Sequence, residues 1–314
     1  MTSTAAVKKP RDPRTGLRTS ATLATVLTIL GHTVLGFEQP WSMVVTALVT
    51  GYTCALLFEW IDAAANGRPV GFLGGGFTKV VDFLLSAHMT SITTSFLIYT
   101  NSRVGAMAFA VAAAIASKYV FRVRLDGRVQ HFMNPSNFGI ALTFVVFPWV
   151  ATMPYLFTEH VTGVWDVAVP VVIFMLGFRL NFLFTGRVPL IASWLVAFVL
   201  QAIVRWSVFD DISLLAALAP MTGAGFVLFT FYKITDPRTT PSTLRGQVAF
   251  GAAVGAAYGV IINYHITFTL FFAMTAAASV RGLLLYASAW QRVLVSQPAA
   301  GGVVPIAPGR ELIQ

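Results

Sequence analysis

Charged residues are scarce in this chain of 314 residues. Only 11% are Asp, Glu, Lys or Arg, whereas 56% are hydrophobic. A soluble domain carries about 25% charged residues, so this chain has too few charges to cover a globule in water. The apolar surplus must face lipid, and we expect an integral membrane protein of the all-α class.

Cysteine is almost absent, since Cys54 is the single thiol in the sequence. One thiol excludes an internal disulfide, a four-thiolate iron–sulfur cluster and a Cys-rich zinc site. The sequence also contains no G-x-x-x-x-G-K-[ST], G-x-G-x-x-G or H-E-x-x-H motif. We therefore do not expect the chain itself to bind NADH or hydrolyse ATP.

Long apolar runs fill most of the sequence. A spanning helix needs about 20 residues, and the runs predict about ten of them in a single domain over residues 19–290. Residues 1–18 are predicted to be a disordered basic cytoplasmic tail, and residues 291–314 a second cytoplasmic tail. The expected spans are 19–37, 41–60, 80–99, 104–121, 137–157, 167–184, 190–207, 214–232, 247–263 and 267–290.

The basic residues behind the net charge of +9 lie mostly in alternate connections between these spans. With the N-terminus in the cytoplasm, all but two of the 21 Lys and Arg residues fall on the inner side, and Arg103 and Arg205 fall outside. This asymmetry obeys the positive-inside rule. It predicts a multi-pass protein of the inner (cytoplasmic) membrane with both termini inside, and it argues against nucleic acid as a partner.

Two polar stretches interrupt the apolar pattern on the expected cytoplasmic side. Residues 118–139 and 232–247 each begin near a Lys and carry a Pro shortly before the next span, at Pro135 and Pro241. Proline suits the first turn of a helix, so we expect helices to begin there, capped with help from the serines that follow. The residues alone favour two basic connecting loops. The alternative is a pair of half-sites whose helix N-termini face an anion.

The same two stretches carry a family resemblance. The segments "ITDPRTTPSTLRGQVAFGAAVG" and "HFMNPSNFGIAL", with a weaker match at "SAHMTSITTSFLIY", resemble motifs of the membrane D subunit of Rnf-type electron transport complexes. The B subunit of the sodium-pumping NADH:quinone oxidoreductase belongs to the same family. The matches come in family order, and the resemblance covers roughly residues 20–290.

The resemblance implies a ten-helix subunit that passes electrons within the membrane by means of flavin. Family members usually carry flavin mononucleotide (FMN) on the last Thr of a Ser-[Thr/Ser]-Gly-[Ala/Glu]-Thr motif. Here the stretch reads "LFTGRVPLIAS", so Thr185 and Gly186 match, Arg187 follows, and Val188 takes the acceptor position. Valine has no hydroxyl to form a phosphoester. We therefore expect FMN or riboflavin, if bound, to be non-covalent.

By this resemblance the chain is a non-autonomous subunit of an electron transport complex, relaying electrons through a bound flavin or quinone. Its expected partners are the lipid bilayer, quinone and other redox or biosynthetic membrane subunits, because divergent relatives accompany natural-product gene clusters in actinobacteria, including those for enediynes. Two alternatives keep the fold without a cofactor: a transporter, or a scaffold for a flavoprotein. The implied cofactor-binding residues are Asn134, Pro135, Thr185, Gly186, Arg187, Lys233, Thr235, Asp236 and Thr240.

Two of these residues have a plain structural alternative. Asp236 would orient a flavin or quinone head group or couple ion movement, or it would form an Asx-type turn before Pro237. Asn134 would face the cofactor, or it would cap the helix that starts at Pro135.

The histidines and glycines within the expected spans also have structural interpretations. His32 and His88 would be core histidines, with ligation of a b-type haem as a minor alternative. Gly251, Gly255 and Gly259 recur every four residues, which predicts a smooth face for tight helix packing.

Overall fold

The computed structural model describes residues 13–125, 128–153, 158 and 160–296. Most of the two expected tails lies outside these residues. The described parts of those tails are helical, because the first helix already begins at Pro13 and the last runs to Ser296. A proline is well placed at such a start, since the first helical N–H needs no partner within the helix.

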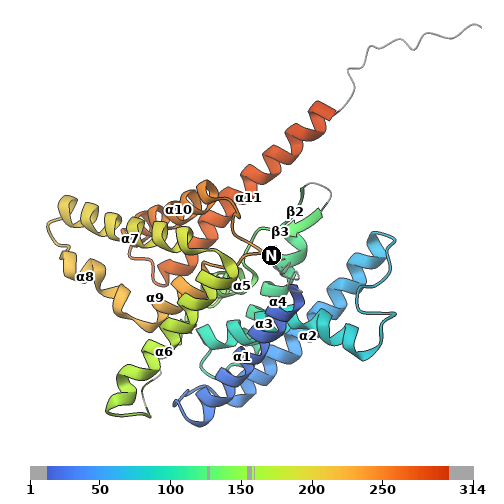
Figure 1. Cartoon of the computed structure of the whole chain (residues 1–314), viewed down its shortest axis with the longest axis horizontal. Helices are drawn as coiled ribbons and strands as arrows, with labels where there is room; N and C mark the ends of the chain where they lie inside the picture. Colours follow the sequence, from blue (N-terminus) through green and yellow to red (C-terminus); the bar gives the residue numbers. More distant parts are fainter. Residues whose placement is uncertain (1–12, 126–127, 154–157, 159, 297–314) are drawn as a thin grey trace, which may run out of the picture.

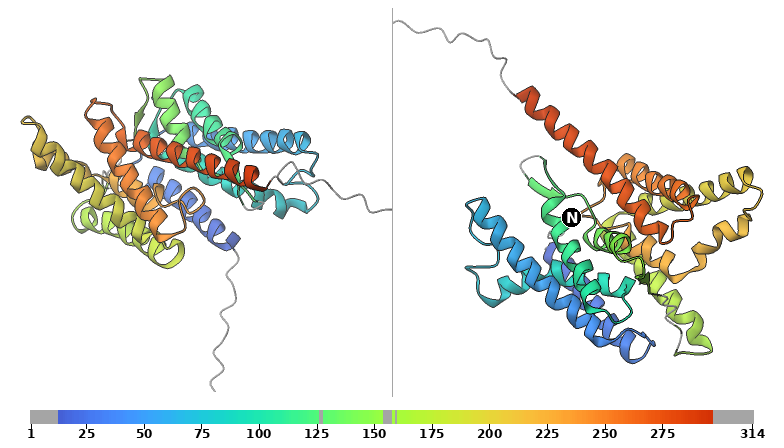
Figure 2. Two further views of the ribbon diagram at one scale, coloured as in Figure 1. Left: turned by 90° about the horizontal axis from the view of Figure 1, so that it is seen from above. Right: turned by 180° about the vertical axis from the view of Figure 1, so that it is seen from behind.

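Helices dominate the described chain, and almost no strand is present (Figures 1 and 2). Two short antiparallel pairs occur: β1 (Ile98–Tyr99) with β4 (Ala151–Thr152), and β2 (Arg122–Leu125) with β3 (Arg128–His131). The α-helices are α1 (Pro13–Thr33), α2 (Trp41–Ala65), α3 (Gly76–Leu97), α4 (Val104–Val120), α5 (Pro135–Val146), α6 (Val164–Leu180), α7 (Val188–Val208), α8 (Leu214–Leu218), α9 (Ala224–Leu228), α10 (Leu244–Ile262) and α11 (Thr269–Ser296). Three shorter turns are η1 (Asn181–Thr185), η2 (Ala219–Thr222) and η3 (Phe229–Lys233).

Six helices of the described chain are long and apolar enough to cross a membrane. A bent pair, Leu214–Thr222 with Ala224–Lys233, raises this number to seven if it forms one span. Helices α4 and α5 are apolar but shorter. The chain is therefore a multi-pass membrane protein with apolar helices suited to lipid contact. The count of ten spans and the inward placement of both termini remain predictions.

Two expected spans differ from the helices observed. The fifth was expected to continue beyond residue 150, but α5 ends at Val146, because Pro148 disfavours a helical conformation in the residue before it. The eighth is broken by a bend of 66°. Pro220 lies in the 3₁₀ turn and Gly223 is extended at the break, and both residue types weaken a helix.

Two hydrophobic cores organise the helices. One is built mainly by α2, α3, α4 and α5, and the other by α7, α9, α10 and α11 with the β2–β3 hairpin. Figure 1 places the first group, from blue to green, beside the second, from yellow to red. Aromatic rings of the first core link α5 to α11, where Phe144 stacks on Phe268 and meets Phe271. The second polar stretch, between η3 and α10, contacts the start of α5 in the first group.

The predicted glycine face packs as expected. A Cβ on Gly251 would lie 2.7 Å from the Leu190 carbonyl oxygen, and one on Gly259 would lie 2.9 Å from Gln201 Cβ. Gly255 approaches Ala197 even more closely. Helices α7 and α10 therefore touch backbone to backbone, which only small residues permit.

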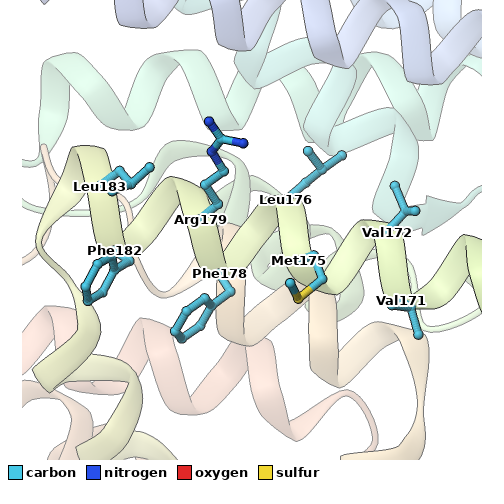
Figure 3. A pocket seen from close by; sticks show the side chains of 8 residues that line it. All are labelled: Val171, Val172, Met175, Leu176, Phe178, Arg179, Phe182 and Leu183. Carbon is cyan, nitrogen blue, oxygen red and sulfur yellow. The ribbon is translucent and has the colours of Figure 1, made fainter.

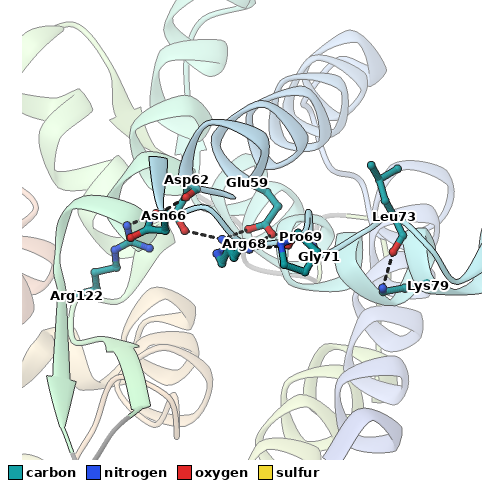
Figure 4. Close-up of polar contacts among 9 residues, drawn as sticks. All are labelled: Glu59, Asp62, Asn66, Arg68, Pro69, Gly71, Leu73, Lys79 and Arg122. Atoms are coloured by element: carbon teal, nitrogen blue, oxygen red, sulfur yellow. Dashed lines mark hydrogen bonds and ion pairs between the residues drawn. The ribbon is translucent and has the colours of Figure 1, made fainter. Parts of the chain in front are cut away.

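An ion-pair network fastens the β2–β3 hairpin to the end of α2 (Figure 4). Arg68 binds Glu59 Oε1 at 2.6 Å and Asp62 Oδ2 at 2.5 Å, and Arg122 of β2 also binds Asp62. The Gly71 N–H donates to Glu59 Oε1 at 2.8 Å. The hydrogen bonds that Arg68 donates to Glu59 and, less strongly, to Asp62 raise the pKa of Arg68. The β2–β3 hairpin, which precedes α5, is thus anchored to the end of α2.

Candidate functional site

The two polar stretches meet in space. Asn134 Nδ2 donates to Asp236 Oδ2 at 3.3 Å, and Lys233 Nζ donates to Ser136 Oγ at 2.6 Å. Ser136 Oγ in turn donates to Asn134 Oδ1 at 3.2 Å. Residues 102 positions apart in sequence therefore form one polar assembly, which we call the loop cluster. Its members Asn134, Ser136 and Lys233 are all buried.

Asn134 caps α5, which is one of its two predicted roles, and its role in facing a cofactor stays a prediction. Its Oδ1 accepts from the Asn137 N–H at 3.0 Å and caps α5, with Pro135 at the start of the helix as predicted. Its Nδ2 meanwhile reaches Asp236 on the other stretch. The cap fixes where α5 begins, and the amide joins that end to the second stretch.

The Asp236 carboxylate is held by neutral donors. Oδ1 accepts from the Arg238 N–H at 3.0 Å, which forms the expected Asx-type turn across Pro237. Oδ2 accepts from Thr239 Oγ1 at 3.0 Å as well as from Asn134. The turn therefore presents one half-buried negative charge to its surroundings.

The second helix start differs from the prediction. Helix α10 begins at Leu244, three residues beyond Pro241, and its cap is Thr243, whose Oγ1 accepts from the Gly246 N–H at 3.2 Å. Ser136 caps no helix, because its hydroxyl bonds Asn134 instead. In both cases a residue with a better-placed oxygen just before the first turn takes the capping role.

Two predicted threonines use their hydroxyls within their own turn. Thr235 Oγ1 donates to the Phe231 carbonyl at 2.9 Å, and Thr240 Oγ1 donates to the Asp236 carbonyl at 2.6 Å. Both side chains are buried. Each donor is already occupied, so these residues shape the loop.

Two π-helical turns adjoin the loop cluster. Asn181 of η1 donates through Nδ2 to the Phe231 carbonyl of η3 at 2.7 Å. Thr185 Oγ1 donates to Asn181 Oδ1 at 2.9 Å, and Gly186 follows with a left-handed φ of +61°. Turns of this kind are rare and concentrate at functional sites. They bring the Thr185 segment and Lys233 to the same region.

Arg187 connects the residues that precede α7 to the second polar stretch. It is 6% exposed, its Nη2 donates to the Pro237 carbonyl at 3.1 Å, and its Nε has no partner among the described residues. Burial lowers the pKa of Arg187, while the nearby Asp236 carboxylate raises it. All nine predicted site residues therefore lie in or beside the loop cluster, and whether they bind a cofactor remains a prediction.

Several members of the site were not predicted. Lys118 Nζ donates to both the carbonyl and Oγ of Ser86 at 3.1 Å, and Arg238 Nη1 reaches the same Oγ at 3.3 Å. Arg281 Nη1 donates to the Thr239 carbonyl at 2.9 Å. A lone arginine inside an apolar run was the one available signal for Arg281. Ser86 opens the weakly matching segment "SAHMTSITTSFLIY", but nothing in the sequence marked it as a site residue.

His131 of β3 also lies within electrostatic reach of this site. Burial lowers its pKa to about 4, the Asp236 carboxylate opposes that change, and Lys118 and Arg238 add to it. The neutral imidazole is therefore the form that the fold favours.

The donor set of the loop cluster suits an anion better than a metal or a haem. Its members are cationic or amide donors, and Arg187 Nε is a buried donor without an acceptor. The described residues contain no group of three His, Cys, Asp or Glu side chains that would hold a metal ion. His88 lies 2.8 Å from Thr25 Oγ1 and 2.6 Å from the Tyr52 hydroxyl, so both ring nitrogens are engaged.

An apolar groove runs along α6 and η1 (Figure 3). It is lined by Val171, Val172, Met175, Leu176, Phe178, Arg179, Phe182 and Leu183. In Figure 3 the Arg179 side chain extends away from Phe178 and Phe182. Most of the α6 side chains are exposed, as suits a helix that faces lipid.

The fold and the site together define a multi-pass membrane protein with a cation-rich polar cluster between two loops. A scan against models of known protein families finds no match, and no curated protein matches the sequence.

Proposed function

We propose that this chain is a membrane redox subunit similar to those of the Rnf-type complexes, relaying electrons through a non-covalently bound flavin or a quinone. The observation that carries the proposal is the contact between Asn134 and Asp236, which joins the two family-like motifs beside Arg187. A bound flavin would supply the redox chemistry, and the protein would supply position and electrostatics.

The residues of the loop cluster have distinct roles in this proposal. Arg187 and Lys233 provide positive potential for a flavin phosphate or an anionic ring. Asn134 and Asp236 fix the geometry of the loop between them. Val188, at the first turn of α7, leaves the flavin without a phosphoester link. Quinone would enter from the bilayer, and the electron donor would be another membrane subunit of a redox or biosynthetic complex.

The proposed membrane arrangement places the loop cluster on the cytoplasmic side of the inner membrane, with ten spans and both termini inside. Support comes from the basic residues gathered at the two stretches that meet.

The test is the chromophore content of the full chain purified in mild detergent from its native membranes. We expect flavin absorbance that moves to the supernatant on acid precipitation. Flavin retained in the precipitate would contradict the role given to Val188. Absence of any flavin or quinone would contradict the redox proposal. Arg187→Gln should lower flavin content, and the exposed Arg124→Gln on β2 should leave it unchanged.

A transporter is the second candidate, favoured by the broken helix pair. Leu214–Thr222 and Ala224–Lys233 are bent by 66°, and discontinuous helices of this kind line solute sites in transporters. Solute uptake into proteoliposomes without an electron donor would support this function. Flavin-dependent electron transfer without such uptake would contradict it.

A further inference from the structure

Positive charge exceeds negative charge in the loop cluster. Its single carboxylate belongs to Asp236, and no cation of the cluster lies within 4.0 Å of a carboxylate oxygen in the described part of the chain. Each cation donates to a neutral oxygen instead. Besides Lys233, these basic side chains include its neighbours around the Asp236 turn, namely Lys118, Arg187, Arg238 and Arg281.

Three cations elsewhere in the described chain have carboxylate partners. Arg18 binds Asp82 at 2.6 Å, and Arg68 binds both Glu59 and Asp62. Arg122 shares Asp62. Lys79 and Arg205 also donate to neutral oxygens, but their contacts are exposed. The loop cluster differs because Lys233 and Arg187, while buried, lack a carboxylate partner among the described residues.

Burial makes this surplus costly. Lys233 is 3% exposed and Arg187 is 6% exposed, and a buried charge needs an opposite charge and full hydrogen bonding to be tolerated. Lys233 makes one hydrogen bond with three available donors, among the contacts of the described residues. The Nε of Arg187 makes none. A bound anion would accept hydrogen bonds from these unsatisfied donors.

The cations surround one short turn. Arg187 and Arg281 bind the carbonyls of Pro237 and Thr239, and Lys118 shares the Ser86 hydroxyl with Arg238 of the same turn. Five side chains from separate elements thus converge within a few residues of Asp236.

We propose that the loop cluster binds a dianionic phosphate group, as inorganic phosphate or as the phosphomonoester of a larger molecule. The three arginines, which stay charged in proteins, exceed the one carboxylate by two charges, and a dianionic ligand would offset that excess. Arginine forks and lysine ammonium groups are the donors that bind phosphate best in proteins. This inference does not depend on electron transfer, and it holds equally for a cofactor-free protein.

The probes for the test are inorganic phosphate, FMN and phosphatidic acid, added to the full chain in phosphatidylcholine nanodiscs. Riboflavin and phosphatidylcholine alone are the matched controls without a phosphomonoester. Thermal unfolding is followed by tryptophan fluorescence, because a ligand that binds the folded state raises the unfolding midpoint.

We expect a saturable rise in the midpoint with at least one phosphate probe and none with its matched control. The probe that acts at the lowest concentration identifies the source of the phosphate. Arg187→Gln and Lys233→Gln should each weaken that binding at least about tenfold, whereas Arg124→Gln should not change it.

No saturable shift with any of the three probes would overturn the inference, and so would equal weakening by Arg124→Gln. Because the wild-type titrations decide the first point, the inference stays testable even if a variant does not fold. Phosphate binding by protein that contains neither flavin nor quinone would support this site and contradict the redox proposal, so the two fail separately.

Discussion

Asp236→Asn removes the one carboxylate of the loop cluster and should destabilise the protein markedly. Asparagine keeps an oxygen for the Arg238 N–H, but it places a second donor where Oδ2 now accepts from Thr239 and Asn134. Loss of one charge-assisted hydrogen bond costs about 1.5–3 kcal/mol. The neighbouring cations lose their only counter-charge, which brings the expected total to about 3 kcal/mol.

The assay is thermal unfolding of the full chain in detergent, without added phosphate. In a chain of 314 residues, a loss of this size should lower the unfolding midpoint by roughly 5 °C. Asp211→Asn is the matched control, because Asp211 is exposed and surface charges contribute at most about 1 kcal/mol. An Asp236→Asn variant no less stable than Asp211→Asn would refute the reasoning.

Three further predictions concern the rest of the fold. Gly255→Val should destabilise the protein by about 1–3 kcal/mol, because its side chain would collide with α7, whereas Gly105→Val, which has open space, should not; thermal unfolding compares them. His131 has a pKa of about 4 in the fold and its ordinary pKa of 6.5 when unfolded. The unfolded chain therefore binds more protons between these values, and the free energy of unfolding should fall as the pH drops from 6.5 to 4. In denaturation experiments, His131→Gln should flatten this pH dependence. Asp62→Asn should loosen Arg122–Leu125 and speed its amide exchange, measured by mass spectrometry; unchanged exchange would count against the ion-pair anchor.

The membrane class could be predicted from composition alone, because so few charges leave lipid as the only solvent for the surface. Helix lengths were harder. Apolar character continues past Val146 although Pro148 stops α5, and the bend at Gly223 falls inside a run whose hydropathy is uninterrupted. Hydropathy measures solvation and not backbone conformation, so proline and glycine decided both cases.

The site was predictable where the motifs were local. Asn134, Asp236 and Arg187 stood out from their immediate neighbours and from the family resemblance. Lys118 and Arg281 could not be assigned to the same cluster, because their contacts join segments far apart in sequence. A single sequence carries no distance information between such segments, and only the folded chain shows that these basic side chains gather around the Asp236 turn.

The most direct measurement of the central claim is cysteine labelling from one side of sealed vesicles. In a Cys54→Ser background, Arg124→Cys and Arg238→Cys each place a thiol at an exposed position near one of the two meeting stretches. Because Asn134 contacts Asp236, an impermeant maleimide should label both variants from the same side, and Arg103→Cys from the other. Labelling of Arg124→Cys and Arg238→Cys from opposite sides would contradict the account.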